Sequence, residues 1–132
     1  MPTHLGALAL LVHDYDEALA YYVGVLGFRL VEDTDLGQGK RWVRIAPGPA
    51  DSPGLLLARA VTGEQRAAVG NQAGGRVFLF LHTDDFVRDY ARLRAAGVTF
   101  LEEPRHESYG RVVVFQDCYG NKWDLLEAPP TL

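Results

Sequence analysis

Three side chains that could bind a metal ion or transfer a proton lie in or beside predicted strands. His13 and His82 each end an apolar run, and Asp124 lies in the last apolar segment of the chain. Imidazole and carboxylate groups are common ligands of divalent ions and can act as general acids or bases. The ordinary alternative is structural, because strand-end histidines bond to nearby backbone and Asp124 can pair with Lys122 or an arginine. One carboxylate alone is a poor site for a divalent ion.

A second set of residues could bind an anion or an aromatic ring. Five polar or aromatic residues cluster near the entry to the seventh predicted strand, most of them in the segment predicted as a loop before it: Arg105, His106, Glu107, Tyr109 and Arg111. Such a cluster can bind an anionic substrate, but it is also typical of a solvated loop. Trp42 and Arg44 share one face of the third predicted strand, either in a pocket or on an exposed edge. Flat ligands could stack on Tyr21, Tyr22, Trp42 and Tyr109.

These residues are positioned by a plan that occurs twice, about 70 residues apart. In the first copy, Asp14 and Glu17 cap a helix that Gly27 ends. Its predicted strands are Leu5–His13, Phe28–Thr34, Lys40–Ala46 and Leu55–Ala60. In the second copy, Asp84 or Asp85 caps a helix that Gly97 ends. Its predicted strands are Val77–Thr83, Val98–Leu101, Arg111–Gln116 and Lys122–Glu127. A duplication of this size tends to create a cleft between the copies, where we expect the functional site.

The connections between these elements are rich in turn-forming residues. Turns are predicted at Leu36–Gly39 and Pro47–Pro53, and Gly120-Asn121 should supply the left-handed residues of a tight turn. The polar, glycine-bearing segment Val61–Gly75 is predicted as a linker between the halves and as a candidate mobile flap.

Composition limits the classes of protein. The chain has 132 residues, 48% of them hydrophobic, so it can bury a core as one domain or two small fused units. Its net charge of -4 and scattered lysines and arginines disfavour a nucleic-acid partner. The single cysteine, Cys118, excludes an internal disulfide and a cysteine metal cluster. With no leader or membrane-length apolar run in view, we expect a soluble cytoplasmic protein without a membrane partner.

The motifs of the two copies resemble those of the vicinal oxygen chelate superfamily over nearly the whole chain. They are Val12-His13-Asp14 before Ala18-Leu19-Ala20-Tyr21-Tyr22, then Leu26-Gly27-Phe28, and later Phe115-Gln116-Asp117-Cys118-Tyr119-Gly120-Asn121-Lys122-Trp123-Asp124-Leu125. The superfamily includes glyoxalases, bleomycin-resistance proteins, extradiol dioxygenases and methylmalonyl-CoA epimerases. Tyr21 departs from the usual Phe-Tyr pair, and Cys118 stands where proline is common. The alternative is an unrelated ferredoxin-like α+β fold.

The resemblance implies an α+β fold in which two βαβββ modules form a cupped mixed β-sheet. A pocket would lie in the hollow of the cup, and the protein would be a homodimer. We expect a single domain over residues 1–132. Module 1 would span about residues 4–60, the linker about residues 61–75 and module 2 about residues 76–128.

The resemblance also implies where a divalent ion would bind. Enzymes of the superfamily hold it with His, Gln or Glu side chains from the first and last strand of each half. Counting from the capping aspartates, the two first-strand positions hold Ala7 and either Val77 or Phe78, and the fourth-strand position holds Leu56 or Leu57. Only the last-strand position is acidic, at Asp124. Three of the four positions therefore cannot bind a metal ion.

The histidines do not stand at these positions, and a metal site built from His13, His82 or His106 together with Asp124 is kept as an alternative. Because side chains alternate along a strand, His13 shares a face with Ala7, and His82 shares a face with Phe78. At ~3.3 Å per residue, His13 lies roughly 20 Å and His82 roughly 13 Å from the usual position, at the rim of the predicted hollow. His4 has the wrong parity, and His106 lies in the predicted loop.

We therefore expect a glyoxalase/bleomycin-resistance-like protein that binds a small, partly apolar molecule in the cupped sheet, with no metal triad and no cofactor. The ligand-pocket candidates are Ala7, Ala9, Leu11, His13, Trp42, Arg44, Leu57, Phe78, Phe80, His82, Tyr109, Arg111 and Asp124. The first alternative is a metal-dependent lyase, isomerase or dioxygenase of the same superfamily with an atypical site that uses Asp124. The second is an interaction module in which Phe78 and Phe80 fill the cup.

Overall fold

The computed structural model describes residues 2–48 and 53–129, and most of the turn predicted at Pro47–Pro53 lies outside them. The chain divides into two compact units, residues 1–69 and residues 70–132, which are described in turn. Each unit contains a β-strand, a helix and further strands, so the predicted α+β class with two βαβββ modules is confirmed.

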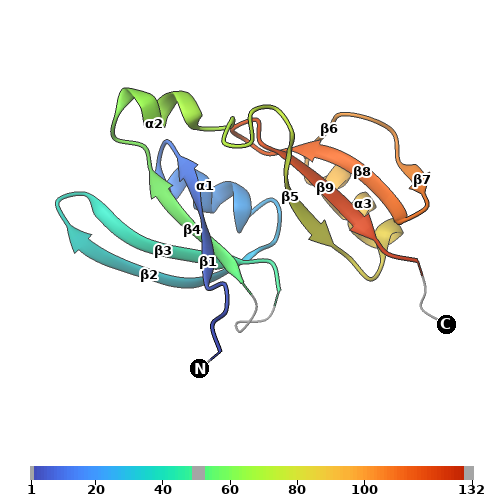
Figure 1. The fold of residues 1–132 in the computed structure, drawn as a ribbon, viewed down its shortest axis with the longest axis horizontal. Helices are drawn as coiled ribbons and strands as arrows, with labels where there is room; N and C mark the ends of the chain where they lie inside the picture. The colour runs from blue at the N-terminus through green and yellow to red at the C-terminus, as the bar shows by residue number, and fades with distance from the viewer. Residues whose placement is uncertain (1, 49–52, 130–132) are drawn as a thin grey trace. The chain divides into compact units, whose positions relative to one another are not determined.

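The first unit forms a four-stranded sheet from its described residues (Figure 1). Its elements are β1 (Ala7–Val12), α1 (Tyr15–Tyr22), β2 (Arg29–Gly37), β3 (Lys40–Ala46), β4 (Gly54–Arg59) and α2 (Gly63–Ala68). The strand order is β1-β4-β3-β2, with β1 parallel to β4 and the other pairs antiparallel. As predicted, Asp14 caps α1, and its Oδ2 accepts a hydrogen bond from the Glu17 amide at 2.8 Å. The helix ends at Tyr22 rather than Leu26, just before Gly24, a residue that disfavours helix.

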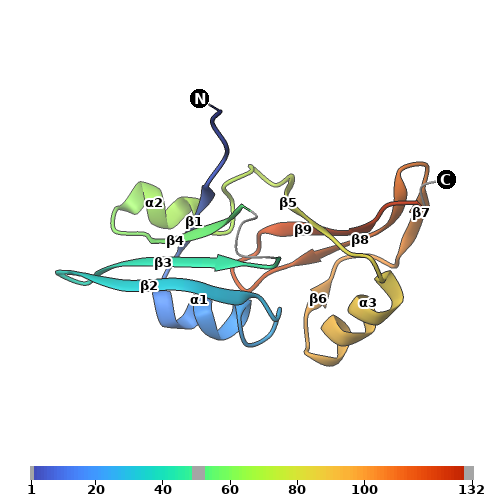
Figure 2. The ribbon, with the colours of Figure 1, turned by 90° about the horizontal axis from the view of Figure 1, so that it is seen from below.

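The two faces of this sheet differ. One face packs against α1 and carries the buried core, which includes Leu10, Val12, Val43, Ile45, Leu55 and Leu57. Because side chains alternate, Leu56 points to the opposite face, in register with both Ala9 of β1 and Arg44 of β3. Helix α2 lies on the opposite side of the sheet from α1 (Figure 2). We call the face that α1 does not cover the open face.

Helix α2 lies within the segment predicted as a linker, where no helix was predicted. Thr62 is its N-cap, with Oγ1 accepting from the Gln65 amide at 3.0 Å, while Gln65 Oε1 accepts from the Val61 amide at 2.8 Å. This reciprocal pattern is close to a capping box, and the Thr62-Gly-Glu-Gln65 spacing in the sequence was its signal.

The second unit forms a five-stranded sheet from its described residues. Its elements are β5 (Val77–His82), α3 (Phe86–Ala95), β6 (Thr99–Phe100), β7 (Arg105–Glu107), β8 (Gly110–Gln116) and β9 (Lys122–Glu127). The order is β5-β9-β8-β6, with β7 also on β8 and β5 parallel to β9. Helix α3 covers one face of this sheet (Figure 2). Stacked or edge-on contacts link Phe86, Tyr90, Phe100, Phe115 and Trp123 into the core.

One prediction about this unit is wrong. The segment before β8 is not a loop, because Arg105–Glu107 pairs with β8 and places His106 opposite Arg111. The edge strand is split into β6 and β7, since Pro104 has no amide to donate, and the Glu102 Oε2 atom instead accepts from the Val114 amide at 3.0 Å.

The turn before β9 also differs from the prediction. Gly120 is left-handed, with a φ of 98°, but Asn121 is not among the residues with positive φ in the described chain. Asn121 is instead buried, and its Nδ2 donates to Asp117 Oδ2 at 3.0 Å. Asp117 also accepts from the Trp123 indole and from two backbone amides, so this buried carboxylate organises the turn.

Candidate functional site

A groove of about 620 Å³ lies at the hairpin end of the first unit's sheet, between the β2–β3 hairpin and the start of α2. Its apolar lining includes Leu11, Leu36, Trp42, Leu56, Leu57, Ala58 and Val61, and Tyr15 and Arg41 border it from the α1 side. Ligand sites in proteins commonly have volumes of about 300–1,000 Å³ and predominantly apolar walls with a few polar groups. The groove therefore has the size and lining of a site for a small organic molecule.

The hairpin beside the groove follows from its sequence. Gln38 and Gly39 have φ angles of 57° and 80°, as a two-residue turn that matches strand twist requires, and Gly37 pairs with Lys40 across it. Trp42 lies two residues into β3 from this turn and is 42% exposed. Its indole Nε1 donates to Glu32 Oε1 at 3.1 Å, so the ring is held by its edge.

Arg41 ties the hairpin to α1. Its guanidinium donates to Asp33 at 2.7 Å and to Asp16 at 2.9 Å, and it lies 5.1 Å over the Tyr15 ring. Its backbone amide donates to the Tyr15 hydroxyl at 3.2 Å. The hydrogen bonds that Arg41 donates to Asp33 and Asp16 raise the pKa of Arg41, and the bond that Asp33 accepts from Arg41 lowers the pKa of Asp33. These contacts are exposed, so they position the hairpin more than they stabilise the fold.

Asp124 lies on the face of the second unit's sheet that α3 does not cover, which we also call an open face. It lies on β9 between Phe80 of β5 and Val114 of β8, and its neighbours Trp123 and Leu125 are buried on the α3 side, as predicted. Asp124 is 8% exposed, and within the described chain its Oδ1 atom is buried with no hydrogen-bond partner. Burial raises its pKa, which the Arg105 charge opposes. An unpaired buried carboxyl is costly, so a proton or a ligand donor at Oδ1 would stabilise it.

The residues of neither unit fit the divalent ion of the superfamily. Asp124 has aromatic and aliphatic neighbours across both adjacent strands, Phe80 and Val114. In the first unit, Ala7 and Leu56 lie on the open face at the two positions where ligands would be needed, and neither can bind a metal ion. Among residues 2–48 and 53–129, no group of three His, Cys, Asp or Glu side chains could hold a metal ion. We therefore derive no chemistry through a metal here.

The structure separates some of the residues predicted to share a pocket. Leu57 borders the groove but is 1% exposed and in register with Val43, so Leu56 is the residue whose side chain points to the open face. The β5–β9 ladder shifts between Val77 and Leu79, and the alternation counted from Phe80 therefore does not extend through Phe78. Phe78 instead borders a small cavity of about 20 Å³ beside Asn121.

The predicted anion cluster around β7 is largely self-neutralised. Arg105 donates to Glu102 at 2.9 Å and to Glu107 at 2.7 Å. Arg111 lies 5.5 Å over the Phe86 ring at the start of α3, which places it on the helix-covered face. Tyr109 is 51% exposed in the β7–β8 turn.

The remaining predicted residues lie on open faces or at strand ends. Ala7, Ala9 and Leu11 follow one another along β1, in register with Gly54, Leu56 and Ala58 of β4. Arg44 has its Nε 4.0 Å from Glu32 Oε1. His13 follows the end of β1, His82 ends β5, and both are exposed.

Sequence reasoning missed the residues that complete the groove. Leu36, Lys40, Ala58, Arg59 and Val61 line it, and none was singled out. Their proximity comes from the antiparallel pairing of β3 with β4, which brings the hairpin beside the end of β4. No local pattern in the sequence signals this pairing.

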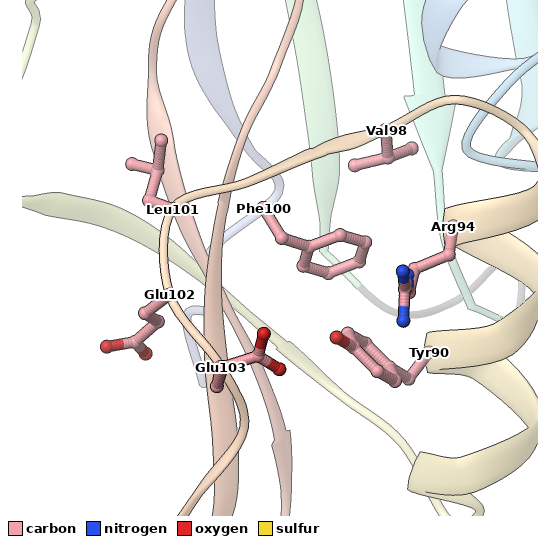
Figure 3. Close-up of a pocket in the computed structure, with 7 residues that line it drawn as sticks. All are labelled: Tyr90, Arg94, Val98, Phe100, Leu101, Glu102 and Glu103. Atoms are coloured by element: carbon pink, nitrogen blue, oxygen red, sulfur yellow. The ribbon is translucent and has the colours of Figure 1, made fainter.

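A second pocket of about 480 Å³ lies in the second unit between α3 and the segment that contains β6 (Figure 3). Figure 3 shows Tyr90 and Arg94 of α3 on the same side of the pocket, facing Phe100. The Arg94 guanidinium lies 5.6 Å over the Tyr90 ring, and Glu102 is bonded to Arg105 and the Val114 amide. Arg94 and Glu102 are thus already engaged by other groups of the protein, which makes this pocket a weaker candidate than the groove.

Comparison with known proteins places the fold. A sequence profile of the Glyoxalase/Bleomycin resistance protein/Dioxygenase superfamily matches residues 4–125. The chain belongs to this superfamily. It is 54% identical over 121 residues to an uncharacterized protein of Shewanella frigidimarina (strain NCIMB 400), a match that covers 91% of this chain and 90% of that one.

Solved structures of the superfamily include close likenesses. The crystal structure of UcmS2 is 29% identical with a TM-score of 0.81, covering 96% of this chain and 98% of that one. TnmS3, an antibiotic binding protein from Streptomyces sp. CB03234, is 30% identical with a TM-score of 0.79, covering 97% and 98%. Neighbours of this glyoxalase-superfamily chain thus include an antibiotic-binding protein. No helix in the described chain is long and apolar enough to cross a membrane.

Proposed function

We propose that this chain binds a small, partly apolar molecule in the groove of the first unit, without a metal ion. The observation that carries the proposal is Trp42, an exposed indole held by Glu32 above a wall of leucine and alanine side chains. A rigid aromatic face beside an apolar wall suits a flat ligand, which gains both stacking and burial. The likeness to TnmS3 supports the same kind of activity.

Titration with N-phenylnaphthylamine, an uncharged flat fluorophore, tests this proposal. Saturable binding with quenching of Trp42 emission is expected. The Trp42→Leu variant should weaken binding by about tenfold, since losing an aromatic stacking partner costs about 1–1.5 kcal/mol. Trp123 is 3% exposed and stays in the core of the second unit, so it reports folding in both proteins. Equal binding by the variant, or no binding by the wild type, would overturn the proposal.

The homodimer and the cytoplasmic location predicted from the sequence belong to the same proposal. The superfamily resemblance supports the dimer. Sedimentation equilibrium of the purified chain tests it, with about twice the 14.6 kDa chain mass expected. A mass of one chain at micromolar concentration would contradict the dimer while leaving the groove proposal intact.

A further inference from the structure

Among the described residues, the charged side chains that line the groove all carry the same sign. Lys40, Arg41 and Arg59 contribute to its walls, and no Asp or Glu within residues 2–48 and 53–129 does. The chain as a whole has a net charge of -4, so the groove concentrates positive charge in an acidic protein. We infer that the ligand of this groove is an anion: a flat, partly apolar molecule that carries an acidic group. This inference rests on the proposed function and names the class of ligand.

Two of the three cations are available to such a group. Arg41 is bonded to Asp33 and Asp16, so its charge is already balanced. Within the described chain, Lys40 and Arg59 make no ion pair. The Arg59 guanidinium lies over the hairpin turn, since a Cβ atom built on Gly39 would be 3.2 Å from its Nη2. Both cations therefore sit at the hairpin end of the apolar wall.

The acidic side chains of the hairpin do not offset these charges inside the groove. Glu32 accepts from Trp42 and faces Arg44, Asp33 binds Arg41, and Asp35 accepts from the Gly37 amide at 2.8 Å. None of them lines the groove. A neutral ligand would leave the two cations unused, whereas an acidic group gains their attraction while its rings stack on Trp42.

Two fluorophores that share one aromatic skeleton but differ in charge separate the contribution of ligand shape to binding from that of ligand charge. Anilinonaphthalene sulfonate is the anionic counterpart of N-phenylnaphthylamine. The wild type should bind the sulfonate about fivefold more tightly, as expected for two partly exposed charge contacts. Added salt should weaken sulfonate binding and leave binding of the neutral probe unchanged.

Arg59→Gln and Lys40→Gln are each expected to weaken sulfonate binding by about threefold, and to weaken it more than they weaken binding of the neutral probe. Arg29→Gln is the matched control, because Arg29 begins β2 and lies at the far end of the strand from the hairpin. Unchanged melting temperatures in all three variants would show that differences in sulfonate binding come from the groove and not from a loss of folded structure.

The outcomes distinguish the two proposals. If both probes bind equally and Arg59→Gln changes neither affinity, the charge inference fails while the proposed function stands. The same holds if Arg29→Gln weakens sulfonate binding as much as Arg59→Gln does. If the wild type binds neither probe, both proposals fail.

Discussion

The indole Nε1 of Trp42 lies 3.1 Å from Glu32 Oε1, and this hydrogen bond fixes the aromatic ring that borders the groove. Trp42 and Glu32 come from adjacent strands, β3 and β2, on either side of the hairpin turn. The geometry of the groove therefore depends on a contact between two exposed side chains rather than on the buried core.

Removing the acceptor should loosen the ring without unfolding the protein. We expect Glu32→Leu to weaken binding of the neutral probe by about threefold, because one exposed hydrogen bond contributes about 0.5–1.5 kcal/mol. Glu32→Gln keeps an oxygen acceptor and should bind the neutral probe as the wild type does. Fluorescence titration of the three proteins checks this. A Glu32→Gln variant as weak as Glu32→Leu would mean that the carboxylate charge matters instead.

Asp124 should make stability fall as the pH rises. Burial raises its folded-state pKa above the ordinary value of 3.8, so between these two values the native state binds more protons than the unfolded state. The contribution of protonated Asp124 to the free energy of unfolding is therefore complete below about pH 4. It is lost as the pH rises through the pKa of Asp124 in the folded state. Asp124→Asn cannot ionise, so its stability relative to the wild type should increase from pH 4 to pH 8. Urea unfolding at several pH values measures this difference.

The test is whether the stability of Asp124→Asn relative to the wild type rises with pH. The size of the difference at any one pH is not a test, because the amide that replaces the carboxyl also changes the stability. Asp84→Asn serves as the control, because Asp84 is exposed and should show no comparable rise. A difference between Asp124→Asn and wild type that stays constant over this pH range would show that the Asp124 carboxyl is ionised normally.

Two glycines near the start of the second unit should respond very differently to alanine. A Cβ atom on Gly70 would lie 1.8 Å from the Tyr119 carbonyl oxygen, whereas a Cβ on Gly74 would meet nothing within 4 Å. Both have positive φ, at 77° and 67°, so both substitutions carry backbone strain of about 1 kcal/mol. We expect Gly74→Ala to cost about that much and Gly70→Ala to cost several times more. Thermal unfolding of the pair measures the gap, and equal costs would contradict the close approach of residues 70 and 119.

Divalent ions should not stabilise this protein. A site with a Kd of about 10 μM would add about 2.7 kcal/mol of stability at 1 mM metal. We expect no change in melting temperature with nickel, zinc, manganese or iron, because no group of three His, Cys, Asp or Glu side chains within residues 2–48 and 53–129 could hold a metal ion. A rise in melting temperature that Asp124→Ala abolishes would instead support the metal-dependent enzyme that the sequence left as an alternative.

Much of the fold could be predicted because its signals are local. Asp14 and Asp85 accept from amides three residues ahead, as their positions before apolar helical patterns indicated. Trp123 and Leu125 alternate with Asp124 and are buried as predicted. Errors arose where the regular pattern is broken. Gly24 shortens α1, and a shift in the β5–β9 register disrupts the face predicted to include Phe78.

By itself, the sequence determined the duplicated βαβββ plan, the superfamily and the absence of metal-binding side chains at three expected positions. The duplicated plan follows from residue type and from spacing along the chain. The superfamily and the expected ligand positions follow from the resemblance of the motifs. Only the tertiary structure decided that the side chain of Leu56 rather than Leu57 reaches the open face, that Arg111 lies over Phe86, and that Lys40, Trp42 and Arg59 line one groove. Strand pairing sets these relations between residues distant in sequence, and alternation within one strand cannot specify the register of its neighbours.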